Sequence, residues 1–331
     1  MNAAPVSVGV QLPTTDGFGV GYRDLRDVGR AAEDAGLDSA WIGDHFSFTS
    51  PVVESMIAAA TVAAATERLR IGFGVLVAPL RHPGWLAKQI SSLQVVSDNR
   101  VILGLGVGGE FAAEWEALGV PVTERRQRIE TTLDALRDLL SGRPARLGPP
   151  FNAAVPPLTP HGEVPPLWVG GRRDAALERA VRHGAGWIGV WMDPPALRAR
   201  VKRLREIAAQ HGRAVPPVGA EVLVHVTDAA DQGRSRMSEF MQQIYGIPYE
   251  QLERYCIGGD EETVTARLSA LCADELRTVV LIPAVHDTIE ALPALGRIAE
   301  RLRSITTPVT PDPTAPEAGT SSAVTSDASR T

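Results

Sequence analysis

Residues 81–109, RHPGWLAKQISSLQVVSDNRVILGLGVGG, decide the fold of this chain. The first half predicts a helix, because apolar residues recur at helical spacing at Leu86, Ile90, Leu93 and Val96. This helix is expected to end at the turn-forming residues 97–99, and the wholly apolar strand Val101–Leu105 follows at once. Glycines stand at positions 104, 106, 108 and 109. A buried parallel strand that ends in such a glycine turn lets another backbone, or a phosphate group, approach closely.

The same alternation of strand and helix runs along nearly the whole chain. Short apolar or β-branched runs predict strands at Val6–Leu12, Ser39–Gly43, Leu69–Val77, Val101–Leu105, Leu167–Val169, Trp187–Gly189, Val218–Val226 and Thr278–Ile282. Amphipathic segments predict helices at Tyr22–Ala35, Val53–Thr66, Pro83–Val96, Arg125–Leu140, Asp174–Arg182, Pro195–Gln210, Thr263–Cys272 and Ile289–Leu302. Eight evenly spaced units predict a closed (β/α)8 barrel, the TIM barrel, with a doubly wound open sheet as the alternative.

Two segments interrupt this rhythm. Arg143–Pro165 is rich in proline and glycine, and Gly233–Gly258 carries several aromatic residues. Insertions of this length in a compact barrel are typically lids or walls of a site, so we expect that role for both. From Thr306 the chain contains mostly Pro, Thr, Ser and Ala. We therefore expect one barrel domain over residues 1–305 and a disordered tail over residues 306–331.

Composition excludes several classes of function. The chain has 331 residues, a formal net charge of −6 and a pI near 5.7, which argues against binding to nucleic acid. Its two cysteines, Cys256 and Cys272, are too few for a disulfide framework, and their spacing fits no metal site. We find no secretory signal and no apolar run long enough for a membrane span, so we expect a cytoplasmic protein.

In barrels of this kind the site lies where the strands end. One such end reads Gly170-Gly171-Arg172-Arg173 and leads directly into a helix. Free backbone N–H groups, the helix dipole and two arginines together favour phosphate binding. The alternative is a tight turn in which Asp174 serves only as the helix N-cap. The adjacent glycine turn at residues 106–109 favours the phosphate site.

Titratable residues lie at other strand ends. His45 can titrate near neutrality and exchange a proton, or it can be a hydrogen-bonded structural residue that follows a capping Asp44. Glu221 and His225 share one face of their strand. They can line the substrate chamber or be satisfied inside the barrel, and we favour the second. Arg125-Arg126 and Glu114/Glu116 are expected on solvated faces or in loop packing.

Several segments together resemble the bacterial luciferase-like oxidoreductase superfamily. They are WIGDHF (41–46), LVAPLRHPGWLAKQISSLQVVSDNRVILGLGVGG (76–109), EWEALGVPVTERRQRIE (114–130), WVGGRRDAALERAVRHGAGWI (168–188) and IGGDEETVTARL (257–268). Each segment alone is weakly specific, but they occur in the family's order and cover most of residues 6–285.

This resemblance implies a barrel that binds FMN or coenzyme F420 at its mouth and forms a homodimer through helices 2 and 3. It implies a bulge at Gly74-Val75-Leu76, often with a cis peptide, that supports the cofactor ring. His45 would lie near the reactive edge of that ring. The implied cofactor-binding residues are Asp44, Gly74, Val75, Leu76, Gly106, Val107, Gly108, Gly170, Gly171, Arg172 and Arg173.

The chain departs from the family branch that oxidises sugar phosphates. That branch has a glutamate where this chain has Gly109, and a tryptophan where this chain has Thr49. Sugar-phosphate oxidation is therefore not expected. The residues expected to form the substrate pocket are apolar or aromatic: Phe46, Phe48, Trp191 and Tyr245. They favour a moderately apolar, uncharged small molecule.

Three functions remain open at this stage. The first is F420-dependent hydride transfer with His45 as the proton partner. The second is an FMN-dependent monooxygenase that uses dioxygen. The third is a barrel that binds flavin without turnover, which the presence of His45 and the glycine turns disfavours.

Overall fold

The computed structural model describes residues 6–15, 24–48, 50–109, 111–228, 230–273, 276–285 and 287–304. The expected tail at residues 306–331 lies outside this described part, and so do Thr49 and Glu110. Within the described part, none of the helices combines the length and the apolar character that crossing a bilayer requires.

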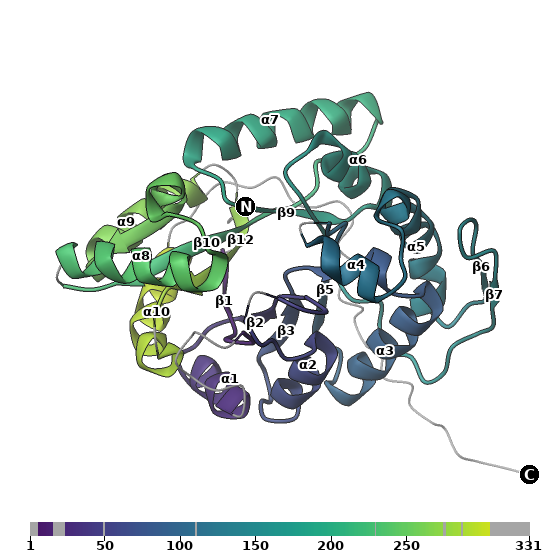
Figure 1. The fold of residues 1–331 in the computed structure, drawn as a ribbon, viewed down its shortest axis with the longest axis horizontal. Helices are drawn as coiled ribbons and strands as arrows, with labels where there is room; N and C mark the ends of the chain where they lie inside the picture. Colours follow the sequence, from purple (N-terminus) through teal and green to yellow (C-terminus); the bar gives the residue numbers. More distant parts are fainter. Residues whose placement is uncertain are drawn as a thin grey trace, which may run out of the picture.

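Eight parallel strands close into a barrel (Figure 1). They are β1 (Ser7–Gln11), β2 (Ser39–Ile42), β3 (Arg70–Phe73), β5 (Val101–Gly106), β8 (Leu167–Gly170), β9 (Gly186–Val190), β10 (Val218–Val226) and β12 (Leu276–Pro283). The short strands β4 (Leu76–Val77) and β11 (Cys256–Gly259) pair with β5 and β10. Strand β1 pairs with β2 on one side and with β12 on the other, where Val10 lies opposite Leu281. The predicted (β/α)8 barrel is confirmed, and the open-sheet alternative is wrong because the first and last strands are hydrogen-bonded.

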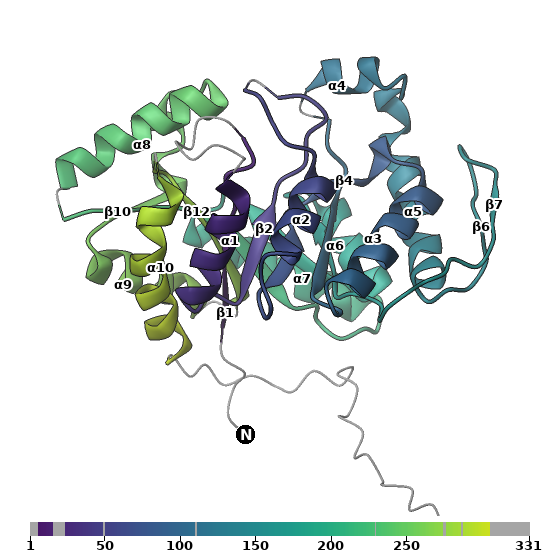
Figure 2. The same cartoon turned by 90° about the horizontal axis from the view of Figure 1, so that it is seen from below.

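An outer layer of helices surrounds the barrel. These helices are α1 (Leu25–Asp34), α2 (Ser55–Ala63), α3 (Pro83–Val96), α5 (Arg125–Leu140), α6 (Asp174–His183), α7 (Pro194–Gln210), α9 (Glu261–Cys272) and α10 (Thr288–Arg303). Two further helices, α4 (Ala112–Ala117) and α8 (Ala230–Tyr245), lie beyond the strands at one end of the barrel (Figure 2). The predicted bounds of α3 and α5 agree with the structure.

The α3–β5 unit forms as its sequence predicts. His82 Nδ1 accepts the N–H of Gly84 at 3.2 Å, and Pro83 occupies the first helical turn, where its missing N–H costs nothing. After the helix, Asp98 and Asn99 adopt positive φ angles of 54° and 59° and turn the chain into β5. Every residue of β5 is buried, as expected for a parallel strand covered on both faces.

Two tryptophans fill the inside of the barrel. The Trp41 and Trp168 side chains project inward and pack with Ile102, Ile188 and Val280. Room for their rings comes from glycines on facing strands. A Cβ atom at Gly72 would lie 2.5 Å from the Trp41 ring, and one at Gly186 would lie 2.5 Å from the Trp168 ring. Side chains therefore fill the barrel interior at the level of the two tryptophans, and the cavity described below lies toward one end.

The first insertion, Arg143–Pro165, does not cover the strand ends. It contains a small hairpin, β6 (Ala145–Arg146) and β7 (Ala154–Val155), that lies outside α5 (Figure 2). The Phe151 ring packs on His82 at 5.2 Å, and the Arg128 guanidinium lies 4.5 Å from the same ring. The expectation that this insertion walls the site is wrong, because it packs against the outer faces of α3 and α5.

The second insertion, Gly233–Gly258, does lie at the strand ends. Helix α8 packs over the end of β10 through an apolar cluster of Leu223, Met237, Phe240 and Met241. Phe48 and Trp191 border the same cluster. This insertion therefore forms one wall at the mouth of the barrel.

Candidate functional site

A cavity of about 270 Å³ opens where the strands end. Residues from nearly every barrel strand line it: Gln11, Leu12, Thr14, Thr15, Gly43, Asp44, His45, Phe48, Val52, Gly74, Val75, Val77, Gly106, Val107, Gly108, Gly109, Phe111, Glu114, Gly170, Gly171, Ile188, Val190, Glu221 and Ile282. The loop residues of β1 in this set, such as Thr14 and Thr15, carry no sequence signal that pointed to the site. This convergence of strand ends marks the cavity as the candidate active site.

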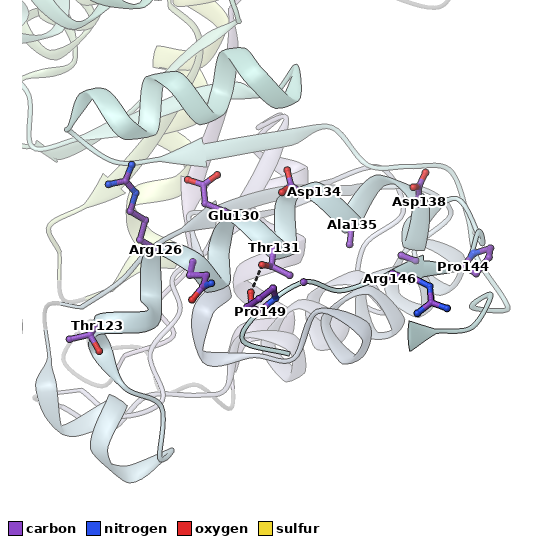
Figure 3. A pocket seen from close by; sticks show the side chains of 13 residues that line it. Thr123, Arg126, Glu130, Thr131, Asp134, Ala135, Asp138, Pro144, Arg146 and Pro149 are labelled. Carbon is purple, nitrogen blue, oxygen red and sulfur yellow. Dashed lines mark hydrogen bonds between the residues drawn. The ribbon is translucent and has the colours of Figure 1, made fainter. Parts of the chain in front are cut away.

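A wider hollow of about 790 Å³ lies on the outside of the barrel along α5 (Figure 3). Glu130, Asp134 and Asp138 project from one side of α5, and the Thr131 hydroxyl donates to the Pro149 carbonyl at 2.7 Å. This hollow is lined by Thr123, by α5 and by residues 144–149 in and around β6, and none of the eight barrel strands contributes to its lining. We therefore place the chemistry at the smaller cavity, where side chains from many strands meet.

The glycine turns after β5 and β8 meet around Val75. A Cβ at Gly106 would lie 2.4 Å from Val75 Cγ2, and a Cβ at Gly170 would lie 2.9 Å from Val75 Cγ1. The Gly74–Val75 peptide is cis, as the family resemblance implies. The predicted residues of these three strand ends therefore come together in one cradle whose backbone borders the cavity. Leu76 is the exception, because its side chain is buried in the core and Val77 lines the cavity instead.

The arginines near this cradle are not placed as expected. Arg172 and Arg173 are both exposed and neither lines the cavity. Arg125, which we expected on a solvated face or in loop packing, packs against the loop at the glycine turn. A Cβ at Gly109 would be 2.1 Å from Arg125 Nη1, so this guanidinium lies directly against the glycine, whose φ of +103° also favours glycine. Arg125 therefore supplies a positive charge beside backbone that borders the cavity.

The Asp44 carboxylate forms hydrogen bonds with four other groups of the protein. Its Oδ2 accepts the N–H of Val77 at 2.7 Å and lies 2.5 Å from Arg81 Nη1. Its Oδ1 accepts the Ser55 hydroxyl at 2.7 Å and Arg81 Nη2 at 2.8 Å. Burial lowers the pKa of the Arg81 guanidinium, but the charges of Asp44 and Glu54 raise it, and the net direction is upward. Asp44 thus joins the end of β2 to β4 and to the starts of α2 and α3.

The His45 imidazole lies in contact with a buried carboxyl group. Its Nδ1 lies 3.3 Å from Oε1 and 3.5 Å from Oε2 of Glu114, whose side chain is only 3% exposed. Glu114 also accepts the N–H of Ser47 at 3.1 Å, so it is held by the loop that carries His45. The imidazole stacks on Phe48 at 4.4 Å and meets the edge of Phe111 at 5.3 Å. Of our two expectations for Glu114, the solvated face is wrong, and its contacts are with the loop that carries His45.

The two polar residues inside β10 differ from one another. His225 Nδ1 lies 2.9 Å from the Ala284 carbonyl oxygen, so this histidine is satisfied, as we expected. Glu221 is not satisfied, because its buried Oε1 has no hydrogen-bond partner among the described residues. Burial raises the pKa of Glu221 to about 8. The expectation of a satisfied pair is therefore wrong for Glu221, which borders the cavity.

Of the residues expected to form the substrate pocket, only some lie at the cavity. Phe48 lines the cavity. Trp191 packs at the edge of the α8 cluster, with its ring centroid 6.4 Å from that of Tyr255. Phe46 is 57% exposed and lies outside the cavity lining. The side chain of Tyr245 lies outside the described residues.

Comparison with known proteins agrees with this geometry. An uncharacterized protein of Mycobacterium tuberculosis is 35% identical over 206 residues, which are 55% of this chain and 71% of that protein. The 4-hydroxyprotoasukamycin monooxygenase of Streptomyces nodosus subsp. asukaensis is 27% identical over 309 residues, which are 84% of this chain and 79% of that enzyme. A solved F420-dependent secondary alcohol dehydrogenase, in complex with an F420–acetone adduct, superposes with a TM-score of 0.79 at 15% identity. The match covers 90% of this chain and 99% of that structure.

Solved structures with this fold include F420-dependent enzymes and an FMN complex. The model of the family described as luciferase-like monooxygenase matches residues 4–261, which is most of the chain. The closed barrel and the cavity at its strand ends agree with this family match. The chain therefore belongs to the luciferase-like monooxygenase family.

Proposed function

We propose that this protein is a coenzyme F420-dependent oxidoreductase that transfers a hydride to or from a moderately apolar small organic substrate. The observation that carries the proposal is the His45–Glu114 pair, because it places a proton-exchanging group in the same cavity as the glycine turns. The solved F420-dependent alcohol dehydrogenase with a similar fold supports the choice of cofactor class.

The lining of the cavity fits both the phosphate and the ring of such a cofactor. Gly108 and Gly171 have φ angles of +55° and +138°, and a larger residue would be strained at either position and would cover the backbone. These turns and the Arg125 charge suit a phosphate. Val75, Ile188 and Ile282 offer an apolar surface for a ring. Arg172 and Arg173, exposed directly after Gly171, suit the acidic tail that F420 carries and FMN lacks.

Coenzyme F420, when bound, supplies the hydride donor or acceptor. The protein's own residues position the reactants and handle the proton. Glu114 contacts His45 at Nδ1, which leaves Nε2 as the nitrogen that can exchange a proton with the substrate. Phe48 and Phe111 pack against this imidazole and against each other, and they help to fix its orientation, while the His45 side chain stays 27% exposed.

Cofactor titration tests the proposal. Apo protein is titrated separately with F420 and FMN while the quenching of tryptophan fluorescence is followed, and substrate-dependent change of the deazaflavin absorbance then reports turnover. We expect micromolar or tighter binding of F420 and turnover with uncharged alcohols or carbonyl compounds. Absence of binding by either cofactor would refute the proposal and favour a barrel without redox turnover.

A second function has its own support. The 4-hydroxyprotoasukamycin monooxygenase matches most of this chain, which favours an FMN-dependent monooxygenase that uses dioxygen. The same cavity would hold either cofactor. Dioxygen consumption that requires reduced FMN and a substrate would select this second function over hydride transfer to or from F420.

We also propose that the protein forms a homodimer through α2 and α3. The outer faces of these helices carry a hollow of about 330 Å³ lined by Met56, Ala60, Trp85, Lys88, Gln89, Ser92, Leu93 and Val96. Ile57, Trp85 and Val96 are 64%, 65% and 71% exposed there. Large apolar side chains gathered on one surface are typical of an interface.

A further inference from the structure

Glu221 is the one acidic side chain that lines the deep part of the cavity from β10. On the flanking strands its neighbours in register are Val190 and Val280, which offer no polar group from their side chains. Its Oε1 is closed off from solvent and has no hydrogen-bond partner within the described part of the chain. A buried carboxyl oxygen without a partner costs about 1–3 kcal/mol, so its presence here requires an explanation.

The structure makes room for this carboxyl group at Gly74. A Cβ atom at Gly74 would lie 2.3 Å from Glu221 Oε1 and 3.1 Å from the Trp41 ring. Glycine at this position therefore allows the carboxyl group to stand directly beneath the bulge before β4. Glu221 is among the residues that line the cavity, and so its side chain lies close to any ring that rests on the bulge.

Burial holds this carboxyl group in its protonated form at neutral pH, since it raises the pKa of Glu221 to about 8. A protonated carboxyl group donates a hydrogen bond through its O–H, whereas the ionised form can only accept. The other titratable groups that border the cavity are Asp44, His45 and Glu114. Asp44 is bound to Arg81 and Glu114 is in contact with His45, so Glu221 is the carboxyl group left to meet a ligand.

We propose that Glu221 donates a hydrogen bond from the floor of the cavity to a carbonyl oxygen or ring nitrogen of the bound cofactor's heterocycle. The inference rests on the proposed function, because the acceptor belongs to the cofactor. Flavins and deazaflavins both carry a pyrimidine-dione edge with such acceptors, and so the role of Glu221 is the same for F420 and FMN. This contact would orient the ring on the Gly74–Val75 bulge.

Binding measurements on three variants test the proposal. Glu221→Leu removes the donor, Glu221→Gln keeps an N–H donor that does not titrate, and Glu178→Gln makes the same change on the exposed face of α6. Dissociation constants for F420 and FMN are measured on the apo proteins by tryptophan quenching between pH 6.5 and 9. Circular dichroism and thermal melts establish that each variant is folded.

We expect Glu221→Leu to weaken binding by about 10-fold or more at pH 6.5, and Glu221→Gln and Glu178→Gln to stay within about threefold of the unmodified protein. The unmodified protein should bind less tightly as the pH rises through 8, whereas Glu221→Gln should show a flat profile. If Glu221→Leu does not fold, this difference between the two profiles decides the question alone.

Three results would overturn the proposal, and they are distinguishable. If the unmodified protein binds a cofactor and the Glu221 variants match it in affinity and pH profile, the role of Glu221 is refuted while the proposed function stands. If the unmodified protein binds neither cofactor, the proposed function fails and the role of Glu221 fails with it. Loss of turnover in Glu221→Leu at unchanged cofactor affinity would assign this donor to the substrate and also refute the contact with the ring.

Discussion

The buried carboxyl group of Glu221 predicts an unusual dependence of stability on pH. In the unfolded chain this carboxyl group titrates near 4.5, whereas in the folded protein its pKa is about 8. Between these values the folded state holds a proton that the unfolded state has released. The free energy of unfolding must therefore fall as the pH rises from about 4.5 to about 8.

The size of this effect follows from proton linkage. Each pH unit over which the two states differ by one bound proton is worth about 1.4 kcal/mol, so the full window is worth about 5 kcal/mol. Glutamine cannot titrate, and Glu221→Gln should lack this loss. The variant should thus become more stable than the unmodified protein by a margin that grows steadily with pH and levels off above 8.

Urea unfolding of the apo proteins, followed by far-ultraviolet circular dichroism at pH 5, 6, 7, 8 and 9, measures this margin. Taking the difference between variant and unmodified protein cancels the titration of every other group, and Glu178→Gln controls for the loss of one acidic residue. A margin that stays constant across the pH range would refute the reasoning, because it would mean that Glu221 has the same pKa in both states.

Four further changes test other parts of the structure. His45→Ala should keep cofactor affinity but lower turnover by at least about 100-fold, and unchanged turnover would exclude His45 as the proton partner. Gly108→Asp places a negative charge in the turn at a φ of +55°, so it should abolish cofactor binding, measured by fluorescence, without changing the circular dichroism spectrum. Gly104→Ala should destabilise the fold by about 1–3 kcal/mol in urea, since its Cβ would lie 2.1 Å from the Phe73 carbonyl oxygen. Trp85→Glu should convert a dimer into a monomer in analytical ultracentrifugation; a species of the same mass would rule out the α2–α3 interface.

The strands and helices of the barrel are largely predictable because burial enforces their periodicity. A parallel strand covered on both faces is continuously apolar, and each outer helix has one apolar face, so Val101–Leu105 and Pro83–Val96 are clear in the sequence. Closure is also predictable, since eight regular units of right-handed crossover bring the last strand beside the first.

The misplacement of Arg143–Pro165 has a topological reason. In a βα barrel the connection from a strand to the next helix lies at the mouth, and the connection from a helix to the next strand lies at the opposite end. This insertion follows α5 and precedes β8, so it starts away from the mouth. Gly233–Gly258 begins soon after β10 ends, and so it reaches the mouth. Length and composition alone do not distinguish these two positions.

Two of the site residues that we misjudged are charged groups whose partners are distant in sequence. Glu114 lies 69 residues from His45, and Arg125 lies in a helix that follows the Gly109 turn. Spacing within one element does not reveal such contacts. For Glu221 a signal did exist, because an acidic residue at an inward-facing position of a buried strand is costly unless a ligand or partner meets it.

The four-way junction at Asp44 has a consequence for assembly. One carboxylate fixes the end of β2 to the first residue of α2, to β4 and, through Arg81, to the segment that enters α3. The next residue is His45, while α2 and α3 carry the exposed apolar surface on the outside. The hydrogen bonds of this one carboxylate therefore connect the two surface helices to the residue that precedes His45. For the homodimer that we propose on that surface, we expect subunit association and ligand binding beside His45 to be linked, so that each strengthens or weakens the other by the same factor.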